Sequence, residues 1–523
     1  MPLAERRQAT AEWLAAGAII AAQVLLVLVT REREATAILS GVHLLFAAFA
    51  RSAVRRNASA VRALAVGVSV VMLLWCGASL CYERHKAAVS WLGRDYNFEA
   101  FRFYRNQEQW PLYGRPGAVR WPQALAMVPA AALLAWWAIG IGPRLKNRRV
   151  AVAGLCVASA LAMIAFGFGD RPERTLAVYH DGLFADDYIY LQANGIGLDG
   201  YVAAMDDLSW FGTHYPPGLM LLYGPSPGVG AVVVLLASAA SVGLAYGAAR
   251  AFGIERPGAW CSAALLATAP LVLMQPTLSS SAAFVAPAAG GLWLCAIVMR
   301  SPSRPRALVA SASVGVLLAG WSFFSFGVGL YAMALGLALV GCVAMGRASI
   351  RRGVAAGTIV AGATGLALIG LYLATSYDTL AGFREASANH YDQIGGRLVP
   401  PREWVSRWLL RGAGNAIAPL VGHLPLTVTA LLGLAWPDGW RRRAMATLAG
   451  AASVAVVLYA SFDGTFVLET ERIWMFFLPA LALPAGAWLA DRDAGDSRGA
   501  AAGVILLSLA LATAQEFLWS PYL

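Results

Sequence analysis

Apolar residues along this chain fall into long runs that are separated by short charged or Gly/Pro-containing segments. Most runs are close to the roughly 20 residues that an α-helix needs to cross a bilayer. None has the alternation of apolar and polar positions that a membrane-spanning strand shows, and an isolated strand cannot satisfy its backbone in lipid. The pattern therefore predicts about fifteen transmembrane helices by this length criterion. They are Trp13–Thr30, Ala35–Ala50, Ala63–Tyr82, Trp121–Pro143, Val150–Gly169, Val229–Ala249, Ala259–Pro276, Ser281–Met299, Ala307–Phe323, Val328–Met345, Val354–Thr375, Ala416–Trp436, Ala444–Ala460, Ile473–Ala490 and Ala501–Trp519.

The composition supports a membrane protein. Of 523 residues, 59% are hydrophobic and 13% are charged, whereas soluble domains carry about 25% charged residues. Three of the runs, 35–50, 307–323 and 444–460, are short for a span. We therefore expect an all-α, polytopic transmembrane bundle of about 13–15 helices.

The net charge of +11 raises the question of a nucleic-acid partner, which would require basic residues clustered on one face. The cations instead lie in short segments between alternate runs. With a cytoplasmic N-terminus, the inner segments hold 23 of the 40 Lys and Arg residues and seven acids, a net charge of +16. The outer segments hold 17 cations and 22 acids, a net charge of −5. This positive-inside asymmetry predicts a multi-pass plasma membrane protein with its N-terminus inside, and it excludes nucleic acid as a partner.

The long connections between runs all fall on the predicted outer side. They are residues 83–120, 170–228 and 377–415, together with the shorter segment 461–471. Functional residues concentrate on loops that a rigid scaffold positions, so we expect the chemistry outside the cytoplasm. Amphipathic stretches in these loops predict interfacial helices that lie along the membrane surface.

The loop 170–228 is the most informative, because it holds seven aspartates. Asp186 and Asp187 are adjacent, and Asp181 precedes them; taken singly, each is explained equally well as an acid that solvates a loop. The segment 214–218 reads His-Tyr-Pro-Pro-Gly, and we call it the HYPPG segment. Two prolines fix φ and the following glycine permits a sharp turn, so the chain is predicted to re-enter the membrane here. This turn places His214 and Tyr215 at the membrane boundary, near the acids.

An aspartate pair in an outer loop, followed by a His-x-Pro-Pro-Gly segment before the next apolar run, resembles the GT-C glycosyltransferases. The matching stretch is Val150–Tyr223. These polytopic enzymes transfer a sugar from a polyprenyl-phosphate carrier to an acceptor outside the cytoplasm, as protein O-mannosyltransferases and aminoarabinose transferases do. The resemblance implies a hexosyl- or pentosyltransferase of cell-envelope glycan biosynthesis, with a glycan, lipid or protein acceptor. The Ala-, Gly- and Arg-rich usage is compatible with a bacterial plasma membrane protein.

The chain departs from the family pattern at its N-terminal side. In that family the acidic loop follows the first helix, whereas four predicted helices precede residue 150 here. We therefore interpret residues 1–149 as an accessory four-helix membrane module and residues 150–523 as the GT-C-like catalytic module. The outer loop 83–120 of the accessory module is basic and aromatic, which suits an anionic lipid surface or a lipid-linked phosphate, and equally an interfacial helix with aromatic anchors.

The reaction implied by the resemblance needs a base for the acceptor proton, and in the family an outer-loop aspartate serves as this base and the product is inverted. On this chain the corresponding residues are Asp186 or Asp187, with Asp181 as a rival. Adjacent acids do not by themselves define a metal-coordination sphere, so no metal ligand or other cofactor is assigned and a divalent metal stays open.

The leaving phosphate needs fixed donors, and Arg suits this task because its fork bonds two oxygens. Arg472 stands at the start of an apolar run beside Glu469 and Glu471, and these three residues with His214 and Tyr215 form the predicted donor-binding set. Snorkelling by Arg472 toward the interface and turn capping by His214 are the structural alternatives.

A transporter or flippase for lipid-linked sugars is the main alternative function. Such a protein should carry polar or charged residues midway through its spans and two related halves, and the runs show almost no mid-span charge and no repeat. A ligase for lipid-linked glycans shares the outer-face geometry and differs in using a diphosphate-linked donor. The crowding of charge at the outer face favours the glycosyltransferase.

Overall fold

The computed structural model describes residues 115–116, 121–170, 184–209, 212–277, 279–301, 303–394, 416, 419–420, 422–463, 474–493 and 499–520. The first three predicted spans, most of the loop 83–120, and the candidate residues Asp181, Glu469, Glu471 and Arg472 lie outside these ranges. The division at residue 149 stays a prediction.

The described chain is almost entirely helical, as the sequence predicts. Its one β-element is a pair of two-residue antiparallel strands, β1 (Arg115–Pro116) and β2 (Trp519–Ser520). The helices are α5 (Trp121–Ala135), η2 (Trp136–Ile141), η3 (Gly142–Arg144), α6 (Arg148–Asp170), α8 (Phe184–Ala193), α9 (Tyr201–Ala204), η4 (Met205–Asp207), α10 (Gly218–Tyr223), α11 (Pro227–Ala251), α12 (Arg256–Thr268), α13 (Pro270–Met274), η5 (Gln275–Thr277), η6 (Ser280–Phe284), α14 (Val285–Arg300), α15 (Arg304–Ser322), α16 (Val328–Ala344), α17 (Ile350–Thr375), α18 (Thr379–Ile394), α20 (Leu426–Ala435), α21 (Pro437–Arg442), α22 (Ala444–Asp463), η7 (Trp474–Phe477), α24 (Leu478–Asp493) and α25 (Gly499–Leu518).

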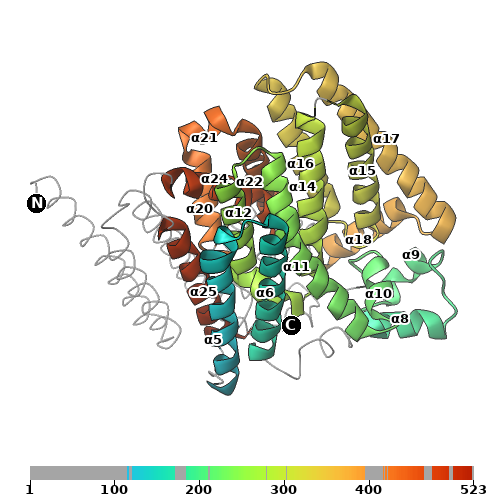
Figure 1. Ribbon diagram of the computed structural model, residues 1–523. Coiled ribbons are helices and arrows are strands. Elements are labelled where there is room, and N and C mark those ends of the chain that lie inside the picture. Colours follow the sequence, from blue (N-terminus) through green and yellow to red (C-terminus); the bar gives the residue numbers. More distant parts are fainter. Residues whose placement is uncertain are drawn as a thin grey trace, which may run out of the picture.

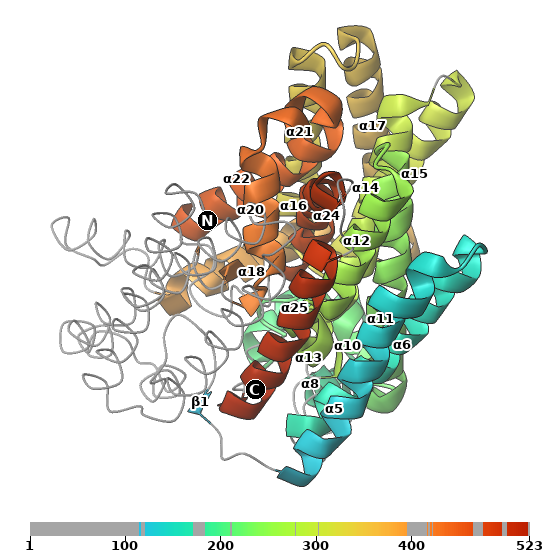
Figure 2. The ribbon, with the colours of Figure 1, turned by 60° about the vertical axis from the view of Figure 1, so that its left-hand side comes forward.

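The long helices pack side by side as a polytopic bundle (Figures 1 and 2). Every predicted span from Trp121 onward contains a helix. Within the described residues, seven helices are long and apolar enough to cross a membrane, or eight if a bent pair counts as one span. The helices α16 and α20 are shorter, as is Ala501–Thr513, the apolar part of α25. Apolar run length therefore locates the helices correctly.

The bent pair is α12 with the segment 270–277, and the bend is 62°. Pro270 supplies no backbone N–H and the preceding Ala269 is extended, so the helix is interrupted there. A hydroxyl group of a neighbouring helix satisfies a backbone carbonyl at the break. Ser508 on α25 donates to the carbonyl of Thr268 at 2.6 Å. A broken span is tolerated in the membrane interior because such groups replace the lost helix bonds.

The core of the bundle lies around α24, whereas α17 is peripheral. In α24 and the turn before it, 89% of the apolar window is buried, against 6% in α17. Small residues allow α24 to approach its neighbours closely: a Cβ at Gly486 would lie 2.4 Å from the carbonyl oxygen of Gly258 on α12. Such close backbone contacts replace hydrophobic driving force between helices in lipid.

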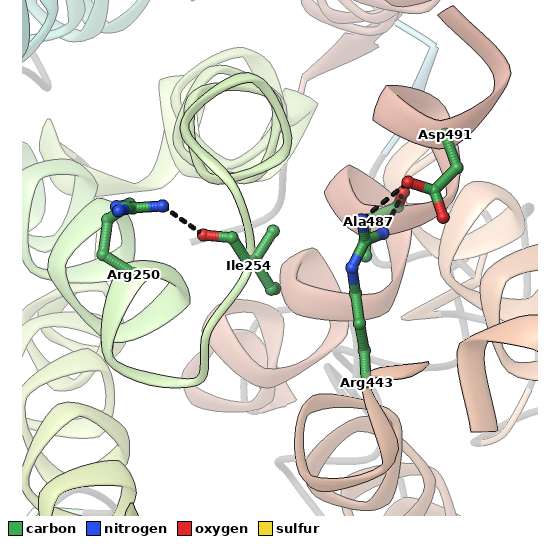
Figure 3. Close-up of polar contacts among 5 residues, drawn as sticks. All are labelled: Arg250, Ile254, Arg443, Ala487 and Asp491. Carbon is green, nitrogen blue, oxygen red and sulfur yellow. Dashed lines mark hydrogen bonds and ion pairs between the residues drawn. The ribbon is translucent and has the colours of Figure 1, made fainter. Parts of the chain in front are cut away.

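The two ends of the bundle differ in character. We call the end that carries α8, α9, α10 and α18 the loop end, and the opposite end, where the predicted inner segments lie, the arginine end (Figure 1). At the arginine end, Arg250 donates to the carbonyl of Ile254 at 2.7 Å, and Arg443 donates to that of Ala487 at 2.9 Å and to the Asp491 carboxylate at 2.6 Å (Figure 3). The first bond satisfies a carbonyl in the turn between α11 and α12, and the other two join the turn between α21 and α22 to α24.

Candidate functional site

The helix α8 divides the predicted aspartate pair between two environments. Its first residue, Phe184, shares a buried face with Asp187 and Leu191, while Asp186 lies on the exposed face with Ile189 and Tyr190. Residues three and four apart share a helix face, whereas adjacent residues point in directions about 100° apart. One carboxylate is therefore inside the protein and the other outside.

Asp187 is only 4% exposed and fastens a distant segment to α8. Its Oδ1 accepts a hydrogen bond from the backbone N–H of Ser209 at 2.7 Å, and its Oδ2 accepts one from the Ser209 hydroxyl at 2.7 Å. Burial raises the pKa of Asp187 above its ordinary value, and the hydrogen bonds from Ser209 and from the backbone of Gly212 oppose that rise. A carboxylate that accepts these bonds is suited to holding the segment 209–212 in place.

Tyr201 on α9 holds the same segment from the other side. Its side chain is 1% exposed, and its hydroxyl lies 3.1 Å from the carbonyl oxygen of Gly212 and 2.9 Å from that of Tyr215. Burial raises the pKa of Tyr201 well above its ordinary value, so the hydroxyl keeps its proton and acts as the donor. The sequence reasoning missed both Tyr201 and Ser209, because a lone Tyr and a lone Ser in a loop give no signal of their partners.

The HYPPG segment leads into α10, and the helix begins at the glycine of this segment. Gly218 is the first residue of α10, and its backbone N–H donates to the carbonyl of Phe323 at 2.8 Å, in the turn between α15 and α16. A Cβ at position 218 would lie 2.3 Å from that oxygen. Glycine is therefore required for close approach of the two backbones.

His214 and Tyr215, both half-buried, precede this turn. His214 Nδ1 and the Thr213 hydroxyl form a hydrogen bond of 2.7 Å, which orients the imidazole. The ring of Tyr215 meets Phe184 edge-on, with the centroids 6.0 Å apart. Because Phe184 and Asp187 share one face of α8, the HYPPG segment packs on the side of α8 that carries the Asp187 carboxylate.

The third long loop also reaches this site. Tyr377, between α17 and α18, is buried with its ring edge-on to Tyr201 at 5.9 Å and to Phe323 at 5.8 Å. The helix α18 also contacts α9 and η4. The turn of the HYPPG segment is thus fixed by elements from three separate parts of the chain.

The structure thus brings together three of the predicted site residues, Asp187, His214 and Tyr215, beside α8, while Asp186 lies on the exposed face of that helix. Asp181, Glu469, Glu471 and Arg472 lie outside the described residues. Among the described side chains, no group of three or more His, Cys, Asp or Glu residues is arranged to hold a metal ion.

Comparisons with known proteins give a distant structural similarity. No family model matches this sequence, and no curated protein matches it. The oligosaccharyltransferase of Archaeoglobus fulgidus in complex with Zn and sulfate has a TM-score of 0.46 and 13% sequence identity, over 70% of this chain and 53% of that one. The Archaeoglobus fulgidus oligosaccharyltransferase AglB in complex with an inhibitory peptide and a dolichol-phosphate has a TM-score of 0.46 and 13% identity, over 72% and 57%.

ArnT from Cupriavidus metallidurans in the apo state has a TM-score of 0.39 and 14% identity, over 66% of this chain and 60% of that one. The chain thus spans little more than half the length of these proteins. At TM-scores below 0.5, these similarities leave the activity to be argued from the residues of this chain.

Proposed function

We propose that this protein is a membrane glycosyltransferase that moves a sugar from a polyprenyl-phosphate carrier to an acceptor hydroxyl at the loop end of the bundle. The observation that carries the proposal is that the two adjacent aspartates of α8 differ in burial and in hydrogen bonding. A buried carboxylate, Asp187, holds the segment that leads into the HYPPG turn, and an adjacent exposed carboxylate, Asp186, stands beside it.

In this reaction the acceptor oxygen attacks the anomeric carbon, the bond from that carbon to the carrier phosphate breaks, and the acceptor proton passes to a base. Asp186 is the better placed base, because its exposed carboxylate has no hydrogen-bond or ion-pair partner among the described residues. Asp187 is a positioning residue, since its oxygens already accept bonds from Ser209. Attack from the side opposite the phosphate inverts the anomeric configuration.

The departing phosphate carries negative charge that needs charge-assisted hydrogen bonds. His214 stands at the membrane-side turn with its ring oriented by Thr213, and it would donate to a phosphate oxygen there. Arg472, with Glu469 and Glu471, remains the proposed cationic part of the donor site. The sugar donor, a glycan, lipid or protein acceptor, and membrane lipids are the proposed partners, and we place the site on the outer face of a bacterial plasma membrane.

One observation favours a second candidate, a transporter or flippase for lipid-linked sugars. The span that contains α12 is broken, and buried Gln275 and Ser280 follow the break. Interrupted helices that carry polar groups are the usual construction of a transport site in a membrane.

The decisive experiment is in vitro transfer from radiolabelled polyprenyl-phosphate sugars by the purified full-length protein. Asp186→Asn is expected to lower the transfer rate by about 10²-fold or more, the usual contribution of a general base. Asp187→Asn and Arg472→Ala should also lower it. The matched control is Asp199→Asn, which changes an exposed acid in the same loop.

Undiminished transfer by Asp186→Asn would contradict the assignment of the base. Movement of lipid-linked sugar across liposomes without any transfer would identify the flippase, and a strict requirement for a diphosphate-linked glycan donor would identify the ligase.

A further inference from the structure

The peripheral helix α17 presents an apolar face that no other described helix covers. Leu366, Ile369 and Leu373 are all more than half exposed, and their spacing places them on one side of the helix. The other side packs on α15, where the Thr364 hydroxyl donates to the carbonyl of Gly315 at 3.2 Å. In a transmembrane bundle, an apolar helix face of this kind contacts lipid.

The chain turns sharply where α17 ends. Ser376 has a left-handed backbone with φ 58°, which is uncommon for a residue other than glycine, and its N–H bonds the carbonyl of Tyr372 at 2.6 Å. Asp378 Oδ1 then accepts hydrogen bonds from the N–H groups of Leu380 at 2.9 Å and Ala381 at 3.0 Å, which caps the start of α18. These two caps send α18 across the loop end instead of along the bundle (Figures 1 and 2).

The orientation of α18 about its own axis is also fixed. Its inner face carries Gly382 and Ala386, both buried and one helical turn apart. The ring of Tyr377 packs over Gly382, so that a Cβ at this position would meet the Tyr377 hydroxyl oxygen at 2.4 Å. The opposite face of α18 is therefore held outward.

Two large apolar side chains and one cation lie on that outward face. Leu380 is 63% exposed and Phe383 is 51% exposed, although the Phe383 ring is held edge-on against Phe326 at 5.6 Å. Arg384 is exposed and its guanidinium has no hydrogen-bond or ion-pair partner among the described residues. At the arginine end, by contrast, Arg250 and Arg443 are bound to carbonyls.

We propose that the outward face of α18, made of Leu380, Phe383 and Arg384, lies in the headgroup region of the phospholipid bilayer. Leu380 and Phe383 enter the boundary with the acyl chains, and Arg384 binds lipid phosphate. The lipid-facing surface of α17 leads toward this face through Leu373, the last large exposed side chain of α17 before the turn. Apolar residues beside a cation are the usual composition of an interfacial helix, and phosphate offers Arg a bidentate partner.

This placement gives the third loop a defined relation to the membrane. Through Tyr377, the turn before α18 contacts Tyr201, which holds the HYPPG segment. The lipid surface and the candidate site are therefore joined by one continuous set of packed residues. The proposal does not depend on the activity assigned to that site.

The test is the membrane depth of α18 in the full-length protein reconstituted into phosphatidylcholine and phosphatidylglycerol vesicles. A nitroxide label is attached at Phe383→Cys after the native cysteines have been replaced, and its collision rates with oxygen and with a water-soluble nickel chelate are measured. Leu373→Cys serves as the lipid-facing reference and Asp199→Cys as the water-facing reference. We expect the Phe383→Cys label to be accessible to oxygen and protected from nickel, as at position 373.

Nickel accessibility equal to that of the Asp199→Cys label would overturn the proposal by placing α18 in water. Protection from both reagents would also overturn it, because the face would then be covered by protein, and spin–spin broadening would identify a second copy of the chain as the cover.

The phosphate contact has a separate readout. Phosphatidylglycerol added to the detergent-solubilised protein should raise the Tm of the wild type and of Arg384→Lys more than that of Arg384→Gln. Equal increases in all three proteins would overturn the assignment of Arg384 to lipid phosphate.

Discussion

Asp186 and Asp187 are neighbours in the sequence but differ in burial and in hydrogen bonding. The exposed Asp186 carboxylate is accessible to a substrate, whereas both oxygens of the buried Asp187 carboxylate accept hydrogen bonds from Ser209. Burial without a positive partner disfavours the charged form of a carboxylate. Asp187 therefore gives the stability of the fold a dependence on pH.

The sign of this dependence follows from the raised pKa of Asp187. Just above the ordinary value of 3.8, the folded protein holds a proton that the unfolded chain has released, so the contribution of Asp187 to stability is full below that pH and is lost as the pH rises through the folded pKa. Asp187→Asn removes the titration. We expect the Tm of the wild type in detergent to fall relative to that of Asp187→Asn as the pH rises above about 4; parallel curves for the two proteins would contradict this.

Tyr201 is expected to position the HYPPG segment without touching substrate. Tyr201→Phe removes the hydroxyl that donates to the carbonyls of Gly212 and Tyr215, at a cost of about 1–2 kcal/mol, because these acceptors lose a buried hydrogen bond. Thermal unfolding measures this loss, and the transfer assay should show a severalfold fall in kcat with little change in KM for the carrier. Tyr190→Phe, on the exposed face of α8, is the control. Equal effects of the two substitutions would argue against a special role for Tyr201.

At the scale of single residues, the sequence predicts the turn of the HYPPG segment, but it does not predict the side-chain contacts around that turn. Two prolines and a glycine restrict the local backbone, so a turn at Gly218, where α10 begins, could be predicted from the chain alone. The division between Asp186 and Asp187 depends on where α8 begins and on a partner 22 residues away. Tertiary partners of this kind have no local sequence signature, so the role of Tyr201 could not be predicted from the sequence.

Among the elements, the contact of α10 with the turn between α15 and α16 is the most sensitive to substitution. Gly218→Ala would place a methyl group 2.3 Å from the backbone oxygen of Phe323, and neither backbone is free to shift without breaking their 2.8 Å hydrogen bond. We expect a destabilisation of about 1–3 kcal/mol, the usual cost of overpacking, measured by thermal unfolding in detergent.

Gly228→Ala is the matched control, since nothing lies within 4 Å of a Cβ at the start of α11. A Tm for Gly218→Ala as high as that of this control would contradict the prediction, because it would show that the turn between α15 and α16 moves to accommodate the methyl group at little cost in stability.

The elements themselves were largely predictable, for a physical reason. A helix that crosses lipid must be long and apolar, so each run from Trp121 onward contains a helix. The break before Pro270 carries a local signal in the proline, but the Ser508 hydroxyl that satisfies the Thr268 carbonyl comes from α25, which only the packed bundle brings near. The turn from α17 to α18 also lacks a local signal, because the left-handed residue is a serine where glycine would be usual.

For the whole molecule, the net charge of +11 is the sum of a positive charge on the predicted inner segments and a negative charge on the predicted outer segments. The predicted inner segments carry +16, and several of their arginines bind backbone carbonyls, such as Arg250 with Ile254 and Arg347 with Arg441. Charge that orients the chain during insertion therefore also satisfies backbone carbonyls at the arginine end of the folded protein. The predicted outer segments carry −5, and their described acids include both residues of the pair on α8.

This division predicts which way α11 crosses the membrane. Ser226 precedes α11 at the loop end, and Glu255 follows it at the arginine end, close to Arg250 and Arg256; both are exposed. Because basic segments stay in the cytoplasm, a membrane-impermeant maleimide should label Ser226→Cys in intact cells and should label Glu255→Cys only after permeabilisation. The unsubstituted protein gives the background from its own cysteines, of which Cys261, Cys295 and Cys342 are buried. Labelling in the reverse order would place the candidate site in the cytoplasm, where the proposed acceptors of cell-envelope glycans would not be found.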